Sequence, residues 1–258
     1  MIGTVGIDHK LLKITMDIIK NLGYNQHEIL DNIQKLYLDG KPIDLDITYS
    51  KGAFYGKFKV KEADGETREI TIEQPRLKFD VFPLSEDVQK IEPLKPLPLD
   101  DLSIDSMMID LPFIVRPTKP DTSITDETGS KMFNRFQGFH TPDDMYETYW
   151  FWINEAFRVL KVGGTLLFKT QNTIYGGINH NTEFFSFMCA EKAGFVTEDT
   201  FVLGAKSRMI SPFMTKQLHA RKFTSTFFVF KKHKSQKHKK FNYWSLIPKL
   251  EESYHHHQ

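Results

Sequence analysis

The sequence predicts an α/β fold built on a mostly parallel β-sheet. Segments with strand character alternate with segments of helical periodicity, and the last two strand candidates follow each other directly. This alternation is typical of a parallel sheet flanked by helices, and the closing pair adds an antiparallel strand. One apolar strand candidate, Ile104–Asp110, ends abruptly on a carboxylate. Open α/β sheets bind ligands at the carboxyl ends of their strands, so Asp110 is a candidate functional residue.

Length and composition fit one large α/β domain or two small ones. The chain has 258 residues, of which 40% are hydrophobic and 13% aromatic, so it can build a sizeable core. Its formal net charge of +1 indicates no partner, but the basic run Lys231–Lys240 suits either a nucleic-acid contact or a solvated tail. The single cysteine, Cys189, excludes an internal disulfide and is expected to be a small core residue. Because the sequence has neither a long apolar run nor a signal-peptide pattern, we expect a cytoplasmic protein without a membrane partner.

The first 40 residues are expected to form a helical segment that packs on the core. Apolar residues at helical spacing predict a first helix over residues 8–22, with Gly23 as its C-cap. Asn25 is the predicted N-cap of a second helix, which ends at Asp39–Gly40.

Two strand candidates follow, separated by an insertion. Ile43–Tyr49 alternates apolar and polar residues and ends in the tight turn Ser50-Lys51-Gly52. Residues 54–74 contain two alternating runs around an Asp-Gly pair, which predicts an inserted β-hairpin. Leu77–Phe82 is the next strand, and it carries Asp80, which is either functional or an ordinary exposed strand residue.

The second half of the chain predicts a long loop followed by helices and strands. Residues 114–142 are rich in proline, glycine and short polar residues, so they form a loop directly after Asp110 that we expect to be mobile. The later elements are a helix over Asp143–Leu160, a strand over Thr165–Thr170, a helix over Asn179–Ala193, and strands over Phe195–Leu203 and Phe223–Lys231.

Several of these passages resemble class I S-adenosylmethionine (SAM)-dependent methyltransferases, in the branch that methylates exocyclic amino groups of bases. The tetrapeptide Asp110-Leu111-Pro112-Phe113 is one position away from that branch's Asp/Asn/Ser-Pro-Pro-aromatic signature. Leu97–Asp105 resembles the loop before the catalytic strand, and Arg158–Gly164 resembles the passage from the fourth helix to the fifth strand. The resemblance covers roughly residues 43–231 and implies a Rossmann-like fold with a seven-stranded, mostly parallel sheet and a terminal antiparallel strand. We expect a catalytic domain over residues 41–232 and a basic tail over residues 233–258.

The resemblance also implies catalytic and cofactor-binding residues. Asp110 and the backbone carbonyl of Leu111 would accept hydrogen bonds from the target amino group, while Phe113 would stack on a flipped base. Asp80 would accept hydrogen bonds from the ribose hydroxyls of SAM, and the turn at Gly52 would pass beneath the cofactor. The implied cofactor-binding set is Asp46, Thr48, Tyr49, Ser50, Gly52, Asp80 and Asp110.

The implied partner is nucleic acid, DNA more than RNA, with adenine N6 as the preferred target and cytosine N4 still open. Seven basic side chains are expected to meet phosphates: Arg116, Lys119, Lys206, Arg208, Arg221, Lys231 and Lys232. No metal is expected, and the sequence does not indicate an oligomeric state. Two other functions stay open. One is a protein of this fold that binds nucleic acid or a partner without methyl transfer, and the other is a methyltransferase for a small molecule or protein.

Overall fold

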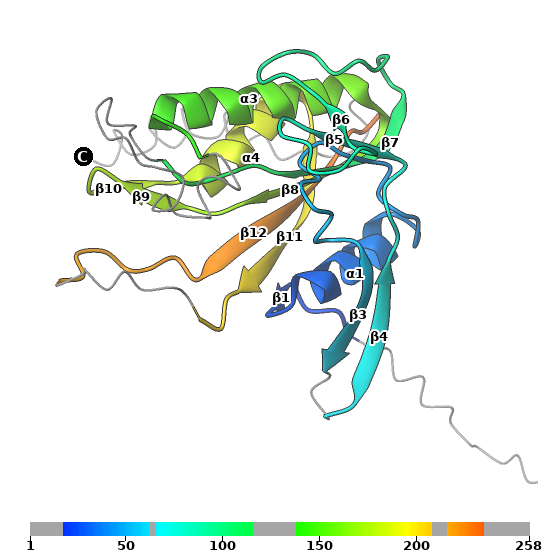
Figure 1. Ribbon diagram of the computed structural model, residues 1–258, viewed down its shortest axis with the longest axis horizontal. Helices are drawn as coiled ribbons and strands as arrows, with labels where there is room; N and C mark the ends of the chain where they lie inside the picture. Colours follow the sequence, from blue (N-terminus) through cyan, green and yellow to red (C-terminus); the bar gives the residue numbers. More distant parts are fainter. Residues whose placement is uncertain (1–17, 62–64, 116–137, 208–215, 235–258) are drawn as a thin grey trace, which may run out of the picture.

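The computed structural model describes residues 18–61, 65–115, 138–207 and 216–234. A single mixed β-sheet forms the centre of the fold (Figure 1). Strand β12 runs antiparallel to both of its neighbours, and all other neighbouring strands are parallel. Across the sheet the strands lie in the order β1 (Leu22–Gly23), β11 (Val196–Gly204), β12 (Thr224–Lys231), β8 (Leu160–Thr170), β7 (Ile104–Asp110), β2 (Leu45–Asp46), β5 (Leu77–Asp80) and β6 (Gln89–Lys90).

The parallel strands have the order of a doubly wound fold. Counted along the chain, β2, β5, β6, β7 and β8 lie in the order third, second, first, fourth, fifth across the sheet. The chain therefore starts in the middle with β2, moves to one edge, and returns to the other side of β2 with β7. The point between β2 and β7 is the topological switch point, where open α/β sheets bind ligands beyond the carboxyl ends of the strands.

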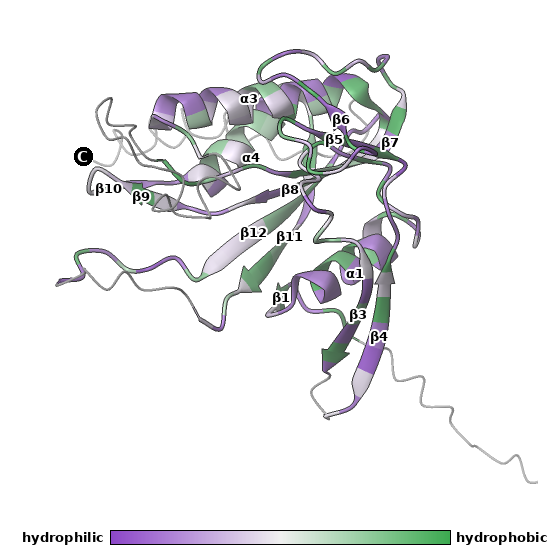
Figure 2. Ribbon diagram, in the orientation of Figure 1, coloured by the Kyte–Doolittle hydropathy of each residue, from purple (hydrophilic) through white to green (hydrophobic). Residues whose placement is uncertain are grey.

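Helices cover both faces of the sheet (Figure 1). On one face lie α3 (Pro142–Val159) and α4 (Thr182–Ala193), which share an apolar core with Phe168 and Phe230. On the other face lie α1 (Gln26–Tyr37) and the hairpin of β3 (Gly56–Lys61) and β4 (Thr67–Ile72), which share a second core with Phe227. Figure 2 shows both hydrophilic and hydrophobic stripes on α1 and α3, as expected for helices that bury one side. A further small hairpin, β9 (Thr173–Tyr175) and β10 (Ile178–His180), follows β8 directly.

The helix ends follow from local sequence signals. The Thr141 side chain accepts a hydrogen bond from the Asp144 backbone, and the Asp144 carboxylate accepts one from the Thr141 backbone, so α3 begins with a complete capping box. The Asn25 side chain caps α1, as predicted, by accepting a hydrogen bond from the His27 backbone. Helix α4 ends at Gly194, whose φ of 109° is the left-handed conformation that favours glycine.

The predicted end of the first N-terminal helix is wrong, whereas the second predicted helix is present as α1. The helix expected over residues 8–22 falls mostly outside the described residues, and Leu22–Gly23, expected at its end, is strand β1. The backbone carbonyl of Asn21 accepts a hydrogen bond from Val202 of β11 at 2.6 Å. Because an unpaired sheet edge offers a row of hydrogen bonds to a passing segment, β1 extends the sheet instead of ending a helix. The sheet consequently has eight strands and not the seven expected.

Other predicted elements are confirmed, some with shifted ends. The strand ending on Asp110, the inserted hairpin and the terminal strand pair are all present, and Cys189 is buried in α4 as expected. The strand expected at Ile43–Tyr49 is assigned only at β2, β8 begins five residues earlier than Thr165, and α4 begins at Thr182 because the preceding residues pair as β10. The long loop expected at 114–142 and the basic tail lie mostly outside the described residues. In the part of the chain described, no helix is both long and apolar enough to cross a membrane.

Candidate active site

Asp110 lies at the end of β7, beside the topological switch point. Its backbone N–H donates to Oγ1 of Thr48, two residues past β2, at 2.8 Å. Its carboxylate Oδ2 accepts a hydrogen bond from Nζ of Lys169 on β8 at 2.9 Å. Neighbouring strands therefore hold both the backbone and the side chain of Asp110. No group among the described residues donates to its other oxygen, Oδ1, which remains available to a ligand.

Asp46 supports this site from beneath and does not reach its surface. It is fully buried; its Oδ1 accepts hydrogen bonds from the backbone and hydroxyl of Thr48, and its Oδ2 accepts one from Tyr55 at 2.7 Å. The cofactor contact expected for Asp46 is not supported by its surroundings, because the side chain is fully buried and its oxygens accept hydrogen bonds from Thr48 and Tyr55. Burial raises the pKa of Asp46 to about 7, and the nearby charge of Asp110 adds to this rise while the hydrogen bonds from Tyr55 and Thr48 oppose it.

We expect Asp46→Asn to remove a pH-dependent penalty on folding. Asp46 titrates near pH 3.8 in the unfolded chain and near pH 7 in the folded protein, so the folded state binds its proton more tightly between these values. The free energy of unfolding of the wild-type protein should therefore fall as the pH rises from 4 to 7, by up to about 1.4 kcal/mol per pH unit from this group. Above pH 7 this contribution should be constant.

Urea denaturation at pH 5, 6, 7 and 8 measures the effect. The Asn variant should show a flatter pH dependence than the wild-type protein, and Asp39→Asn, at an exposed turn, should follow the wild type. A wild-type free energy of unfolding that rises across this window relative to the Asp46 variant would contradict the assignment.

Asp80 ties the end of β5 to the turn that follows β2. Its Oδ2 accepts a hydrogen bond from the backbone of Ser50, and its Oδ1 accepts one from the backbone of Phe82, both at 2.7 Å. Burial raises the pKa of Asp80, and the hydrogen bonds from Phe82, Ser50 and Val81 oppose this rise. The side chain is only partly buried, and each carboxylate oxygen can accept a second hydrogen bond. Asp80 can therefore still receive the hydroxyl groups of a ligand.

The expected role of Gly52 is not supported by its surroundings. Its φ of 67° favours glycine, but a Cβ atom there would lie 2.4 Å from the hydroxyl oxygen of Tyr49. The Tyr49 ring is buried, stacks on Tyr55 with centroids 5.6 Å apart, and donates a hydrogen bond from its hydroxyl to Gln74. The close approach that the resemblance assigned to a cofactor is taken here by the protein's own tyrosine.

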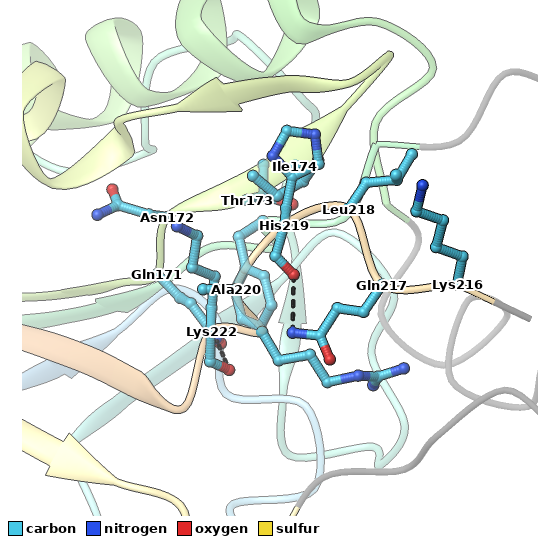
Figure 3. Close-up of a pocket in the computed structure, with 12 residues that line it drawn as sticks. Gln171, Asn172, Thr173, Ile174, Lys216, Gln217, Leu218, His219, Ala220 and Lys222 are labelled. Carbon is cyan, nitrogen blue, oxygen red and sulfur yellow. Dashed lines mark hydrogen bonds between the residues drawn. The ribbon is translucent and has the colours of Figure 1, made fainter. Parts of the chain in front are cut away.

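A cationic pocket opens beside the tetrapeptide that Asp110 begins (Figure 3). It has a volume of about 380 Å³ and includes Phe113 in its wall. The side chain of Gln171, just past β8, donates to the backbone carbonyl of Lys222 at 2.9 Å and so joins the two sides of the pocket. Among the described residues, its walls contain no carboxylate and consist of Phe113, residues 171–174 and residues 216–222, the last group contributing Lys216, His219, Arg221 and Lys222.

The predicted catalytic and nucleic-acid residues are only partly brought together. Leu111 is buried, the Pro112 carbonyl accepts a hydrogen bond from Tyr149 at 3.1 Å, and Phe113 and Arg221 both line the pocket. Lys206 is exposed on the segment that follows β11. Arg116, Lys119 and Arg208 lie outside the described residues.

The phosphate contacts expected for Lys231 and Lys232 are not supported by the surroundings of these residues. Both residues lie at the end of β12 that pairs with Thr165, the opposite end of the sheet from Asp110. Lys232 is buried and donates to the backbone carbonyls of Phe157 and Leu160, and Lys231 donates to the Thr165 hydroxyl at 2.9 Å. The Lys232 ammonium satisfies carbonyls at the end of α3, a favourable place for a cation, so this side chain is not free for phosphate. Burial lowers the pKa of Lys232.

Two residues of the candidate site were not predicted from the sequence. Lys169 pairs with Asp110, and Tyr55 covers Asp46. A lysine directly after the apolar run Leu166–Phe168 was an available signal, because lysine is rarely buried without a partner. Tyr55 offered no such signal, since it lies in the insertion. Within the described ranges no group of three or more His, Cys, Asp or Glu side chains is suited to a metal ion.

Comparisons with known proteins give distant structural matches only. No family model matches the chain, and no curated protein matches it. Among solved structures, it is similar to the PvuII DNA methyltransferase (cytosine-N4-specific), with 14% identity over 52% of this chain and 44% of that chain and a TM-score of 0.37. It is similar to a SAM-dependent methyltransferase from Methanosarcina mazei, with 12% identity over 80% of this chain and 97% of that chain and a TM-score of 0.40. A SAM-dependent methyltransferase from Thermotoga maritima, named a "possible histamine N-methyltransferase", matches with 16% identity over 80% of this chain and 92% of that chain and a TM-score of 0.34.

The fold is nevertheless defined by the sheet itself. The parallel strands have the doubly wound order, and the reversed strand β12 lies between β8 and β11. This is the Rossmann-like fold of class I methyltransferases, as the sequence predicted. The chain spans less than half the length of the PvuII enzyme, and identities of 16% or less give no information about the substrate.

Proposed function

We propose that this protein is a SAM-dependent methyltransferase that acts on an exocyclic amino group of a nucleic-acid base, with adenine N6 of DNA as the preferred target. The observation that carries the proposal is the position of Asp110. Asp110 stands at the switch point, where Thr48 holds its backbone and Lys169 holds its carboxylate oxygen Oδ2. Among the described residues no group donates to its Oδ1, and Phe113, three residues further along the chain, lines a cationic pocket.

The chemistry requires a hydrogen-bond acceptor at this place. An exocyclic amine is a poor nucleophile because its lone pair is delocalised into the ring. Oδ1 of Asp110 would accept one N–H and the carbonyl of Leu111 the other, which localises the lone pair and orients it for in-line attack. Phe113 would stack on the flipped base. SAM, when bound, supplies an already activated methyl group, so the protein's main contribution is positioning.

The residues at the end of β5 fit such a cofactor. Asp80 is a fixed, partly exposed carboxylate with acceptor capacity for ribose hydroxyls. Because Tyr49 covers Gly52, we place the cofactor between Asp80 and Asp110 and not against that glycine.

Nucleic acid is the preferred substrate because the pocket beside Phe113 is lined with cations. Lys216, Arg221 and Lys222 can meet phosphates, and the aromatic ring beside them can take a base. The preference for DNA and for adenine N6 rests on the resemblance of the tetrapeptide to the amino-methyltransferase signature.

A second function is favoured by the covered glycine. If the Tyr49 ring keeps the cofactor out, the protein binds nucleic acid or a partner without methyl transfer. Calorimetric titration with SAM separates the two functions directly, and transfer of a radiolabelled methyl group to DNA and RNA then identifies the substrate. Failure to bind SAM would reject the enzyme and favour the binding protein.

Asp80→Ala should weaken SAM binding at least tenfold, which corresponds to about 1.4 kcal/mol. The ribose hydroxyls would lose their acceptor, and the Ser50 turn would lose its link to β5. The matched control is Asp87→Ala, an exposed aspartate nearby that pairs with Lys78. Equal SAM affinity of folded Asp80→Ala and Asp87→Ala in the same titration would exclude the ribose role.

A further inference from the structure

Lys169 is a partly buried cation placed directly against the proposed catalytic carboxylate. It lies opposite Asp110 in the pairing of β7 with β8, and its Nζ is 2.9 Å from Oδ2 of Asp110. Its side chain is only 13% exposed and that of Asp110 24%. The ammonium also lies over the rings of Phe54 and Phe227, 5.2 Å and 5.6 Å from their centroids. Strand pairing and aromatic contacts therefore hold this cation in one place.

The ion pair changes the net charge that a substrate meets. The charges of Asp110 and Lys169 cancel each other, and the carboxylate beneath them, Asp46, is buried under Tyr55 and partly protonated near neutral pH. Without Lys169, the uncompensated carboxylate of Asp110 would face the acceptor site and would attract ammonium or guanidinium groups. A protonated amine has no lone pair, so a site that attracts cations would collect the unreactive form of an acceptor.

We propose that Lys169 is a positioning and specificity-determining residue. It turns Oδ1 of Asp110 toward the acceptor and neutralises the charge of the carboxylate. The site therefore binds neutral amines with a delocalised lone pair and rejects cationic amines. This inference rests on the proposed function and narrows its substrate class. Aminopurines and aminopyrimidines fit such a site, whereas alkylamines that are protonated at neutral pH do not. Lys169 acts through Asp110 and does not itself contact the methyl acceptor.

The protein contains a matched control for this ion pair. Lys161 pairs with Asp105 at 2.8 Å between the same two strands, at their opposite ends and on the surface. Lys169→Met removes the charge and keeps an unbranched side chain against Phe54 and Phe227. Lys169→Gln keeps a hydrogen-bond donor without the charge, and Lys169→Arg keeps both.

The first experiment needs no cofactor. NMR titration of the full chain with benzylammonium and with neutral 9-methyladenine should show that the wild-type protein does not prefer the cation. Lys169→Met and Lys169→Gln should bind benzylammonium at least tenfold more tightly, while Lys169→Arg and Lys161→Met should match the wild type. A wild-type preference for benzylammonium, or unchanged cation affinity in folded Lys169→Gln, would overturn the proposal.

The second experiment measures methyl transfer. We expect Lys169→Met to lower kcat at least tenfold with an unchanged KM for SAM, and Lys169→Arg to stay within threefold of the wild type. A Met variant as active as the wild type would overturn the positioning role. If the wild-type protein methylates no nucleic acid while the shift in cation affinity is observed, the proposed function fails and the charge role of Lys169 stands.

Discussion

Asp110→Ala should abolish methyl transfer while leaving SAM affinity nearly unchanged. The carboxylate would contact the amino group of the substrate, so its loss affects the transition state far more than the cofactor complex. A loss of at least about 100-fold in kcat is expected for removal of a positioned hydrogen-bonding group in the reaction. Single-turnover transfer of a radiolabelled methyl group, with calorimetric titration of SAM, measures both quantities.

The control for this variant is Asp105→Ala. Asp105 lies at the other end of β7 and also pairs with a lysine of β8, so its replacement removes a similar ion pair away from the site. It should retain wild-type activity. Turnover by a folded Asp110→Ala protein at the wild-type rate would rule out Asp110 as the acceptor of the target amine.

Replacing Lys216, Arg221 and Lys222 together by glutamine should strongly weaken nucleic-acid binding and its dependence on salt. All three side chains line the pocket beside Phe113. Each phosphate contact on duplex DNA contributes about −0.9 to the slope of log affinity against log salt, so the slope should become shallower by roughly three units. Fluorescence anisotropy with a labelled duplex and a labelled single strand between 50 and 300 mM salt would measure it.

A charge-matched control lies on the inserted hairpin. Lys57, Lys59 and Lys61 are exposed on β3. In Figure 1 this strand lies at the lower right, away from the orange segment before β12, at the left, that contains residues 216–222. Their replacement by glutamine changes the net charge equally and should leave the slope near the wild-type value. Equal losses in the two triple variants would indicate general electrostatic attraction and would remove the pocket from the proposed interface.

Local patterns were sufficient to predict much of this fold. The strand that ends on Asp110, the helix α3, the end of α4 at Ala193 and the inserted hairpin all appear close to where they were predicted. Each of these features depends on side chains within a few positions of one another, where periodicity, capping and turn preferences act directly. The order of helices and strands along the chain was also sufficient to predict the mostly parallel sheet, because connections between parallel strands through helices allow few topologies.

The remaining features depend on contacts between distant segments. Leu22–Gly23 is a strand because the edge of β11 is beside it, and Gly52 is covered because the Tyr49 ring folds onto it. Lys232 looked like part of a basic tail, yet its ammonium is held by carbonyls of α3 more than 70 residues earlier in the chain.

The residues of the candidate site also fall into those that the sequence indicated and those that only the structure revealed. The sequence by itself indicated Asp110, Phe113 and Asp80 as candidates, because each ends a recognisable strand or belongs to the tetrapeptide. Only the tertiary structure showed that Lys169, 59 positions away, faces Asp110 and that Asp46 is buried beneath Tyr55. Charge balance and burial are properties of the assembled sheet, since they depend on which strands become neighbours and which side chains cover them.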